Sequence, residues 1–134
     1  APEGAIEFFH VYTYSGHPLA CAAGLATLEV YREEDLFARA AELAPYFQEA
    51  VHSRADCKNV IDVRNLGLMG AIELESIPNK LTVRAMEAFQ KAFERGLLVR
   101  TTGDTIALSP PLIVERKHID FIAETVRDVL KTVH

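Results

Sequence analysis

The chain has 134 residues, of which 49% are hydrophobic and 25% charged, and a formal net charge of −5. This profile is typical of a soluble globular domain and excludes a disordered or low-complexity chain. The lysines and arginines are scattered, and the longest apolar run (residues 18–26) is far shorter than the roughly 20 residues that span a bilayer, so we expect neither a nucleic-acid partner nor a membrane span.

The first quarter of the chain contains an unusual helix. Residues 1–16 have no helical period and are predicted to form a loop. Residues 17–32 are apolar on nearly all sides, and a helix of that kind needs protein around it. This chain offers little to surround it, which indicates a missing larger domain. The composition changes at residues 33–35, so we place a domain boundary there, between residues 1–34 and residues 35–134.

A second helix is predicted from about Asp35. Pro45 interrupts it, and an interior proline costs about 3 kcal/mol because it removes a hydrogen bond and clashes one turn back. We therefore expect a kink or two consecutive helical pieces. The apolar stripe of this helix is Leu36, Ala40, Leu43, Phe47 and Val51.

Residues 59–64 and 68–74 are predicted to form two strands around a turn at residues 65–67. The pair should be antiparallel, because three residues cannot make a parallel crossover. Pro78-Asn79 is expected to open a third helix and Gly96 to end it. The predicted inner face of that helix is Leu81, Ala85, Phe89 and Ala92.

Two further strands, residues 97–101 and 105–108, flank a tight turn at Gly103-Asp104. A Ser-Pro-Pro run at residues 109–111 ends the sheet, and a final helix begins near Glu115. Its apolar face is Ile119, Ile122, Val126, Val129 and Val133. The predicted fold class is α+β, with helices packed on one face of a small, mainly antiparallel sheet.

Cys21 and Cys57 are the only cysteines, and neither has a second cysteine at metal-ligand spacing. We expect Cys21 to be a small buried thiol, and we predict no metal site. A disulfide between the two is possible but unsupported. Reduced thiols favour the cytoplasm. Acidic residues stand where a signal peptide would be basic, and a start at Ala1 without Met fits a trimmed product or a piece of a longer protein.

Residues 8–24 (FFHVYTYSGHPLACAAG) join an aromatic, hydroxyl-rich loop to the apolar helix. This segment closely resembles the class III aminotransferases, which use pyridoxal 5′-phosphate (PLP). In that family the threonine of the motif hydrogen-bonds the phosphate of the cofactor bound by the neighbouring subunit, and Thr13 stands at that position. A hydroxyl suits a phosphate because it donates without adding charge. The alternative for Thr13 is a turn or helix-entry hydroxyl. For His17 we expect a structural hydrogen-bonding role before Pro18, because no histidine or carboxylate lies at metal-ligand spacing from it.

The lysine that holds PLP as a Schiff base lies upstream of this motif in the family, as does the acid beside the pyridine nitrogen. The lysines of this chain all fall in polar, solvated contexts: Lys58, Lys80, Lys91, Lys117 and Lys131. The resemblance therefore implies the C-terminal part of an enzyme, with no catalytic residue in this chain and no activity alone.

Residues 97–105 (LLVRTTGDT), followed by SPPLI at residues 109–113, resemble β-alanine–pyruvate and related ω-amino acid aminotransferases. The arginine of that segment receives the substrate carboxylate, and Arg100 matches it. A guanidinium offers a planar fork to a carboxylate and stays charged at any working pH. Beside the turn at Gly103, the long side chain could swing to serve both substrates. The alternative is an ion pair of Arg100 with Asp104, or with Glu73 across the sheet.

Residues 60–74 (VIDVRNLGLMGAIEL) resemble the hairpin that opens the small domain in this family. Family members usually carry glycine where Asn65 stands, and asparagine tolerates left-handed backbone. We interpret Gly67 and Gly70 as residues that satisfy backbone geometry. Arg64 is interpreted as structural, as is Glu73.

The resemblance implies the C-terminal small domain of a fold-type I PLP-dependent transferase, preceded in residues 1–34 by the end of the large PLP-binding domain. The implied enzyme is at least a homodimer that moves an amino group from an ω-amino acid such as β-alanine to pyruvate. Amine–pyruvate, 4-aminobutyrate and ornithine aminotransferases are close alternatives. A non-catalytic α+β dimerisation or binding module is the alternative from another class.

Overall fold

The computed structural model describes residue 3 and residues 13–134, so most of the loop predicted for residues 1–16 lies outside the described residues. The chain divides into two compact units, residues 1–35 and residues 36–134. The first unit holds α1 (Pro18–Glu33). The second holds, in chain order, α2 (Leu36–His52), β1 (Val60–Leu66), β2 (Met69–Leu74), α3 (Val83–Glu94), β3 (Arg100–Thr102), β4 (Thr105–Leu108) and α4 (Arg116–Leu130). The predicted order of helices and strands is confirmed.

Helix α1 confirms the helix predicted for residues 17–32. Pro18 occupies its first turn, where the N–H that proline lacks would have no helical partner anyway. No residue of α1 is buried, and its leucines are largely exposed, Leu19 at 77% and Leu25 at 64%. Cys21 is exposed as well, so the prediction of a buried thiol is wrong for this chain. Both cysteines are free.

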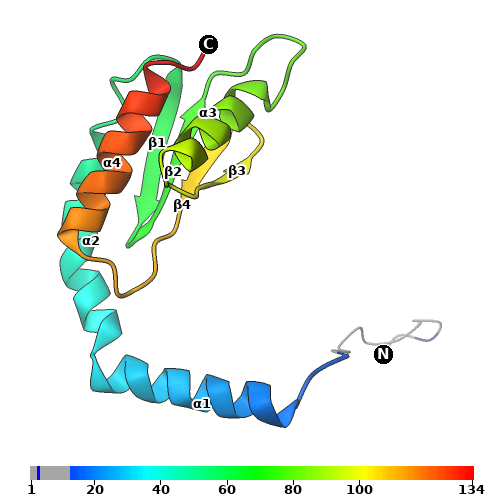
Figure 1. Ribbon diagram of the computed structural model, residues 1–134, viewed down its shortest axis with the longest axis vertical. Coiled ribbons are helices and arrows are strands. Elements are labelled where there is room, and N and C mark those ends of the chain that lie inside the picture. The colour runs from blue at the N-terminus through cyan, green and yellow to red at the C-terminus, as the bar shows by residue number, and fades with distance from the viewer. Residues whose placement is uncertain (1–2, 4–12) are drawn as a thin grey trace. The chain divides into compact units, whose positions relative to one another are not determined.

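The second unit is built on a four-stranded sheet in the order β1-β2-β4-β3, in which every neighbouring pair is antiparallel (Figure 1). Along β2 and β4 alternate residues are buried, so one face of the sheet belongs to the core. Helices α2, α3 and α4 cover that face, with α3 against β3 and β4 and α2 against β1 and β2. This arrangement confirms the predicted α+β class.

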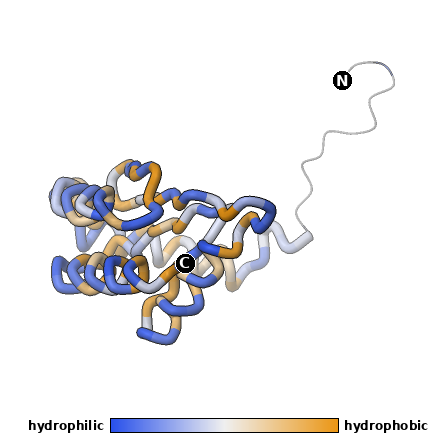
Figure 2. The backbone as a smooth tube through the Cα atoms, turned by 90° about the horizontal axis from the view of Figure 1, so that it is seen from above, coloured by the Kyte–Doolittle hydropathy of each residue, from blue (hydrophilic) through white to orange (hydrophobic). Residues whose placement is uncertain are grey.

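The core of the second unit lies between this sheet and the three helices. Its largest fully buried side chains come from every layer: Phe47, Ile72, Leu74, Ile106, Ile119 and Leu130. Figure 2 shows hydrophobic and hydrophilic positions alternating around the helical turns, which is the pattern of helices with one buried stripe. None of the helices in the described part of the chain has the length and apolarity needed to cross a membrane.

Helix α2 runs through Pro45 as one helix, so the expected division into two helical pieces is wrong, while the expected kink stays a prediction. Residues on both sides of the proline are buried, namely Leu36, Phe47 and Val51. Burying each such side chain stabilises the fold by about 1.5–3 kcal/mol, which together exceeds the roughly 3 kcal/mol cost of the proline. Tyr46 also ties α2 to α4, because its hydroxyl donates to Asp120 while the Arg116 guanidinium lies 4.4 Å from its ring centre.

The first hairpin differs from its prediction in the turn. Leu66 pairs with Met69, so Gly67 and Leu68 alone form the turn, and Asn65 lies in strand β1. Gly67 has φ of +56°, while Asn65 is not in the left-handed region. The asparagine therefore needs no special backbone, and the predicted turn at residues 65–67 is wrong by two residues.

The predicted start of the third helix is also wrong. Residues 77–80 form a tight turn closed by a bridge between Ile77 and Lys80, and α3 begins only at Val83. Leu81 is therefore 70% exposed, and the buried alanines of α3 are Ala85, Ala88 and Ala92. Gly96 follows the helix with φ of +82° and confirms the predicted stop. Strand β3 is shorter than predicted, because residues 97–99 are not in the sheet.

Candidate functional site

Arg100 opens β3, a three-residue strand at the edge of the sheet that pairs only with β4. It lies opposite Ala107 and is exposed. Among the described residues the Arg100 side chain has no hydrogen bond or ion pair. Both partners that the sequence suggested are engaged elsewhere, since Glu73 accepts from Arg64 at 2.7 Å and the Asp104 carboxylate accepts from Ser76. The predicted structural alternative for Arg100 is wrong.

Arg100 lines a hollow of about 570 Å³ with walls that are mostly apolar. Phe89 of α3 and Ile122 of α4 contribute to the hollow, and so do Leu98 and the Pro-Pro pair that follows β4. An unpaired guanidinium next to an apolar hollow can bind a carboxylate in a bidentate way while the walls receive a short carbon chain. Arg100, the predicted substrate-binding residue, therefore lies at a cavity.

Asp104 lies in the turn that joins β3 to β4, at the other end of β3 from Arg100, and is only 8% exposed. Its carboxylate accepts hydrogen bonds from Ser76 Oγ at 2.8 Å, Thr82 N at 3.0 Å and Ala85 N at 3.3 Å. Burial alone would raise the pKa of Asp104, but these hydrogen bonds and the nearby Arg84 charge outweigh burial and hold the pKa below its usual value. The carboxylate is therefore ionised at neutral pH.

Arg64 forms a separate charged cluster on the first hairpin. Its Nη1 lies 2.5 Å from Asp62 and 2.7 Å from Glu73, and these two hydrogen bonds raise the pKa of Arg64. All three side chains are well exposed, so the cluster resembles a surface ion-pair network. This agrees with the structural interpretation of Arg64 and Glu73.

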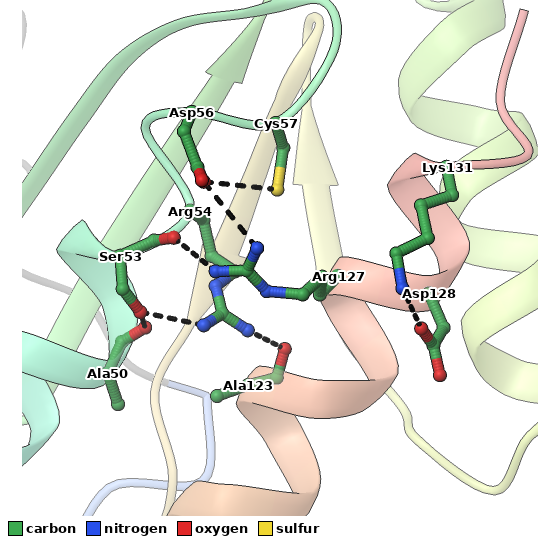
Figure 3. Close-up of polar contacts among 9 residues, drawn as sticks. All are labelled: Ala50, Ser53, Arg54, Asp56, Cys57, Ala123, Arg127, Asp128 and Lys131. Atoms are coloured by element: carbon green, nitrogen blue, oxygen red, sulfur yellow. Dashed lines mark hydrogen bonds and ion pairs between the residues drawn. The ribbon is translucent and has the colours of Figure 1, made fainter.

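A third cluster joins the end of α2 to α4 (Figure 3). Arg54 is 8% exposed and donates to the carbonyl of Ala123 and to Ser53 Oγ. Arg127 donates to the Ser53 carbonyl at 2.6 Å and lies 3.7 Å from Asp56. Burial, and then the charge of Arg127, lower the pKa of Arg54. Arg127 thus binds a carbonyl just beyond the end of α2, where a helix leaves carbonyls without partners, whereas Arg54 binds a carbonyl of α4.

Sequence reasoning missed the burial of Arg54. The stretch from Ser53 to Lys58 is polar and looks like a solvated loop. Only the contact with α4, 69 residues further along the chain, takes the guanidinium out of solvent. No local sequence signal could have found it.

Thr13 lies in an exposed turn that spans residues 13–16 and precedes α1. His17 is the residue before the helix, and its side chain makes no capping hydrogen bond. None of the described contacts of Thr13 tests its phosphate-binding role, which stays a prediction. Thr13 belongs to the first unit and Arg100 to the second. Tyr12, which precedes Thr13 in the motif, lies outside the described residues.

The lysines do not form a Schiff-base site for PLP. Lys58, Lys80, Lys117 and Lys131 are exposed. Lys91 is half-buried, but its ammonium is paired with Glu87 at 2.6 Å and bonded to the Thr132 carbonyl. The residues present therefore do not fit the covalent attachment of PLP, and no chemical step is assigned to this chain. Within residue 3 and residues 13–134 no cluster of acidic, histidine and cysteine side chains could hold a metal ion.

Comparison with known proteins places these observations in a family. Residues 2–130 match the family Aminotransferase class-III. The chain is 65% identical over 128 residues to an ω-aminotransferase of Caulobacter vibrioides and 43% identical over 129 residues to a β-alanine–pyruvate aminotransferase of Pseudomonas aeruginosa. Each alignment covers 96% of this chain and 29% of the relative. The chain thus spans under a third of the length of these relatives.

Solved structures agree. A thermostable ω-transaminase variant from Pseudomonas jessenii superposes with a TM-score of 0.82 at 30% identity, over 92% of this chain and 29% of that one. A second structure, the adenosylmethionine-8-amino-7-oxononanoate aminotransferase from Methanocaldococcus jannaschii, superposes with a TM-score of 0.83 at 27% identity. The match covers 95% of this chain and 30% of that one. This chain belongs to the class III aminotransferases, a family of PLP-dependent transaminases. Membership favours an enzyme over a stand-alone binding module.

Proposed function

We propose that this chain is part of an aminotransferase that moves an amino group from an ω-amino acid such as β-alanine to pyruvate. The observation that carries the proposal is the exposed Arg100 guanidinium at an apolar hollow, which has no partner among the described residues. Both β-alanine and pyruvate present a carboxylate, which Arg100 would bind. The names of the relatives support the same substrates, since two of them are a β-alanine–pyruvate and an ω-amino acid–pyruvate aminotransferase.

The proposal includes the parts of the enzyme that this chain does not supply. Residues 1–34 would be the end of the large PLP-binding domain and residues 35–134 the small domain. Thr13 would donate a hydrogen bond to the PLP phosphate held by a second subunit, so the enzyme would be at least a homodimer. The chain alone would be inactive, because none of its lysines is placed to hold PLP. We place the enzyme in the cytoplasm.

The test uses the full-length enzyme with PLP, and it follows alanine formation from β-alanine and pyruvate. Arg100→Ala should reduce kcat/KM for β-alanine roughly 10- to 100-fold, the range for losing a hydrogen bond to a charged group. Arg95→Ala is the matched control, because Arg95 is an exposed arginine just before β3 whose side chain, among the described residues, donates to the Lys91 carbonyl alone. Equal β-alanine activity in the two variants would reject the role of Arg100.

The substrate preference is tested separately from the family. One relative acts on putrescine by name, at 36% identity, and others are named γ-aminobutyrate transaminases. Turnover of a diamine or of 4-aminobutyrate in preference to β-alanine would keep the aminotransferase and replace the substrate. If the enzyme turns over neither β-alanine, nor a diamine, nor 4-aminobutyrate, the proposal that its amino donor is an ω-amine is wrong.

A further inference from the structure

The strand that carries Arg100 is weakly held by the sheet itself. Strand β3 has three residues and one partner strand, with Arg100 opposite Ala107 and Thr102 opposite Thr105. Edge strands of this length contribute few backbone hydrogen bonds. The position of Arg100 therefore depends on what fixes β3 at its two ends: Val99, which is buried in the core just before Arg100, and the turn at Gly103-Asp104, where β3 joins β4.

Asp104 fixes that turn on two sides. Its backbone carbonyl accepts a hydrogen bond from Leu74 N at 2.8 Å, which holds the turn to the end of β2. Its buried carboxylate accepts from Ser76 Oγ and from two backbone N–H groups at the start of α3, those of Thr82 and Ala85. One residue thus joins the hairpin of Arg100 to a neighbouring strand, to a loop and to a helix.

Helix α3 depends on Asp104 in turn. The residue before the helix, Thr82, has φ of +70° and makes no side-chain cap. Helix N-termini leave N–H groups without partners, and a negative charge there is stabilising. Asp104 supplies the cap from another part of the chain. Because α3 carries Phe89, which lines the same hollow as Arg100, Asp104 fixes two walls of that hollow.

We propose that Asp104 is a positioning residue that holds the Arg100 guanidinium at the mouth of the hollow and so sets the selectivity for donors that carry a carboxylate. The inference rests on the proposed role of Arg100. Asp104 itself does not reach a substrate, because its carboxylate is buried and fully engaged with Ser76, Thr82 and Ala85. Its effect on the preference for a carboxylate therefore passes through Arg100, whereas an effect through Phe89 would change the rates of both kinds of donor alike.

The test compares two amino donors of almost equal size on the full-length enzyme with PLP. β-Alanine has a carboxylate where propylamine has a methyl group. Uptake of the amino group from each donor is followed by the absorbance of the cofactor without any acceptor, so the carboxylate of pyruvate does not enter. The measured quantity is the second-order rate constant of this half-reaction, and the ratio of its value for β-alanine to its value for propylamine is compared between variants.

Asp104→Asn keeps the size of the side chain and removes the charge that accepts from three donors. We expect it to lower the ratio about three- to tenfold, within the range measured for coupled neighbouring residues. Arg100→Ala should lower the ratio further. In the Arg100→Ala background, Asp104→Asn should change the ratio by less than about twofold, because a positioning residue has no effect once its target is gone. Asp128→Asn is the control, since Asp128 is exposed and its one ion pair within the described part of the chain is with Lys131.

The outcomes separate the two proposals. Suppose that Arg100→Ala lowers the ratio, whereas Asp104→Asn lowers the rate constants for both donors by the same factor. Asp104 is then merely structural and the inference is wrong, while the proposed function stands. If Arg100→Ala leaves the ratio unchanged, the proposed function fails and the inference fails with it. If Asp104→Asn does not fold, Ser76→Ala decides, because it removes one of the three hydrogen bonds and keeps the carboxylate. A ratio lowered by more than about twofold then supports the inference, and a smaller change rejects it.

Discussion

Gly70 lies directly against the ring of Phe47. A Cβ at Gly70 would be 3.2 Å from Phe47 Cε1, 3.3 Å from Cζ and 3.4 Å from Cγ1 of Val51. Phe47 is fully buried, so this contact sets how closely α2 packs on β2. Gly70 does not have a positive φ, unlike Gly67. The sequence-based interpretation of Gly70 as a backbone-geometry residue is therefore wrong, and what the position requires is space.

Gly70→Ala should destabilise the fold by about 1–3 kcal/mol, the usual cost of overpacking a core. Urea unfolding of the full-length enzyme measures the loss, and the double variant Gly70→Ala with Phe47→Leu is the control. Adding Phe47→Leu to Gly70→Ala should recover part of the loss, and a Gly70→Ala protein as stable as wild type would contradict the packing argument.

Local patterns predicted the order of the elements, because apolar periodicity reports the faces that α2, α3, α4 and the strands bury. They failed where distant contacts decide. Pro78-Asn79 looks like a helix start, yet α3 begins at Val83. The reason is that its cap, Asp104, comes from a hairpin turn 22 residues beyond Thr82. No window around residue 78 contains that information.

The candidate site shows the same division. Arg100 was assigned by resemblance, while residue types alone favoured an ion pair with Asp104 or Glu73. Only the pairing of β1 with β2 shows that Glu73 lies within reach of Arg64, on the other strand of the same hairpin. The hollow next to Arg100 is likewise formed by α3, α4 and the segment after β4, which are distant in sequence.

Cys57 should be a slowly reacting thiol. Burial is the main effect that raises its pKa, and the nearby Asp56 adds to it through its charge and a hydrogen bond, although Arg127 and Arg54 oppose them. In a Cys21→Ser background, labelling by iodoacetamide against pH should show an apparent pKa above the ordinary value of about 8.5. The same protein unfolded in urea should return to that value. A folded pKa at or below the unfolded one would show that the two arginines dominate.

Thr13→Ala should weaken PLP binding by roughly tenfold, the loss expected for one hydrogen bond to a charged group. Thr13→Ser keeps the hydroxyl and should bind PLP within about twofold of wild type. Equilibrium titration of the cofactor-free full-length enzyme with PLP measures both affinities. If alanine and serine behave alike, the hydroxyl does not reach the phosphate, and Thr13 is a turn residue, as its exposed position before α1 also permits.

The pH dependence of stability should reveal the buried carboxylate of Asp104. Its pKa is lower in the folded than in the unfolded protein, so between the two values the unfolded chain binds more protons and stability rises with pH. The contribution is complete above the unfolded pKa of about 3.9 and is lost as the pH falls through the folded pKa. Asp104→Asn should therefore cost about 1–3 kcal/mol at neutral pH and progressively less below about pH 4.

Urea midpoints of the cofactor-free full-length protein, measured between about pH 2.5 and pH 6, provide the test. Glu87, Glu115 and Asp128 also have lowered pKa values, but they are present in both proteins and cancel in the difference. Asp128→Asn should show only a small difference at any pH, because its partner Lys131 is exposed. A gap between wild type and Asp104→Asn that stays constant down to the lowest pH would mean that shape, and not charge, is what Asp104 contributes to the start of α3.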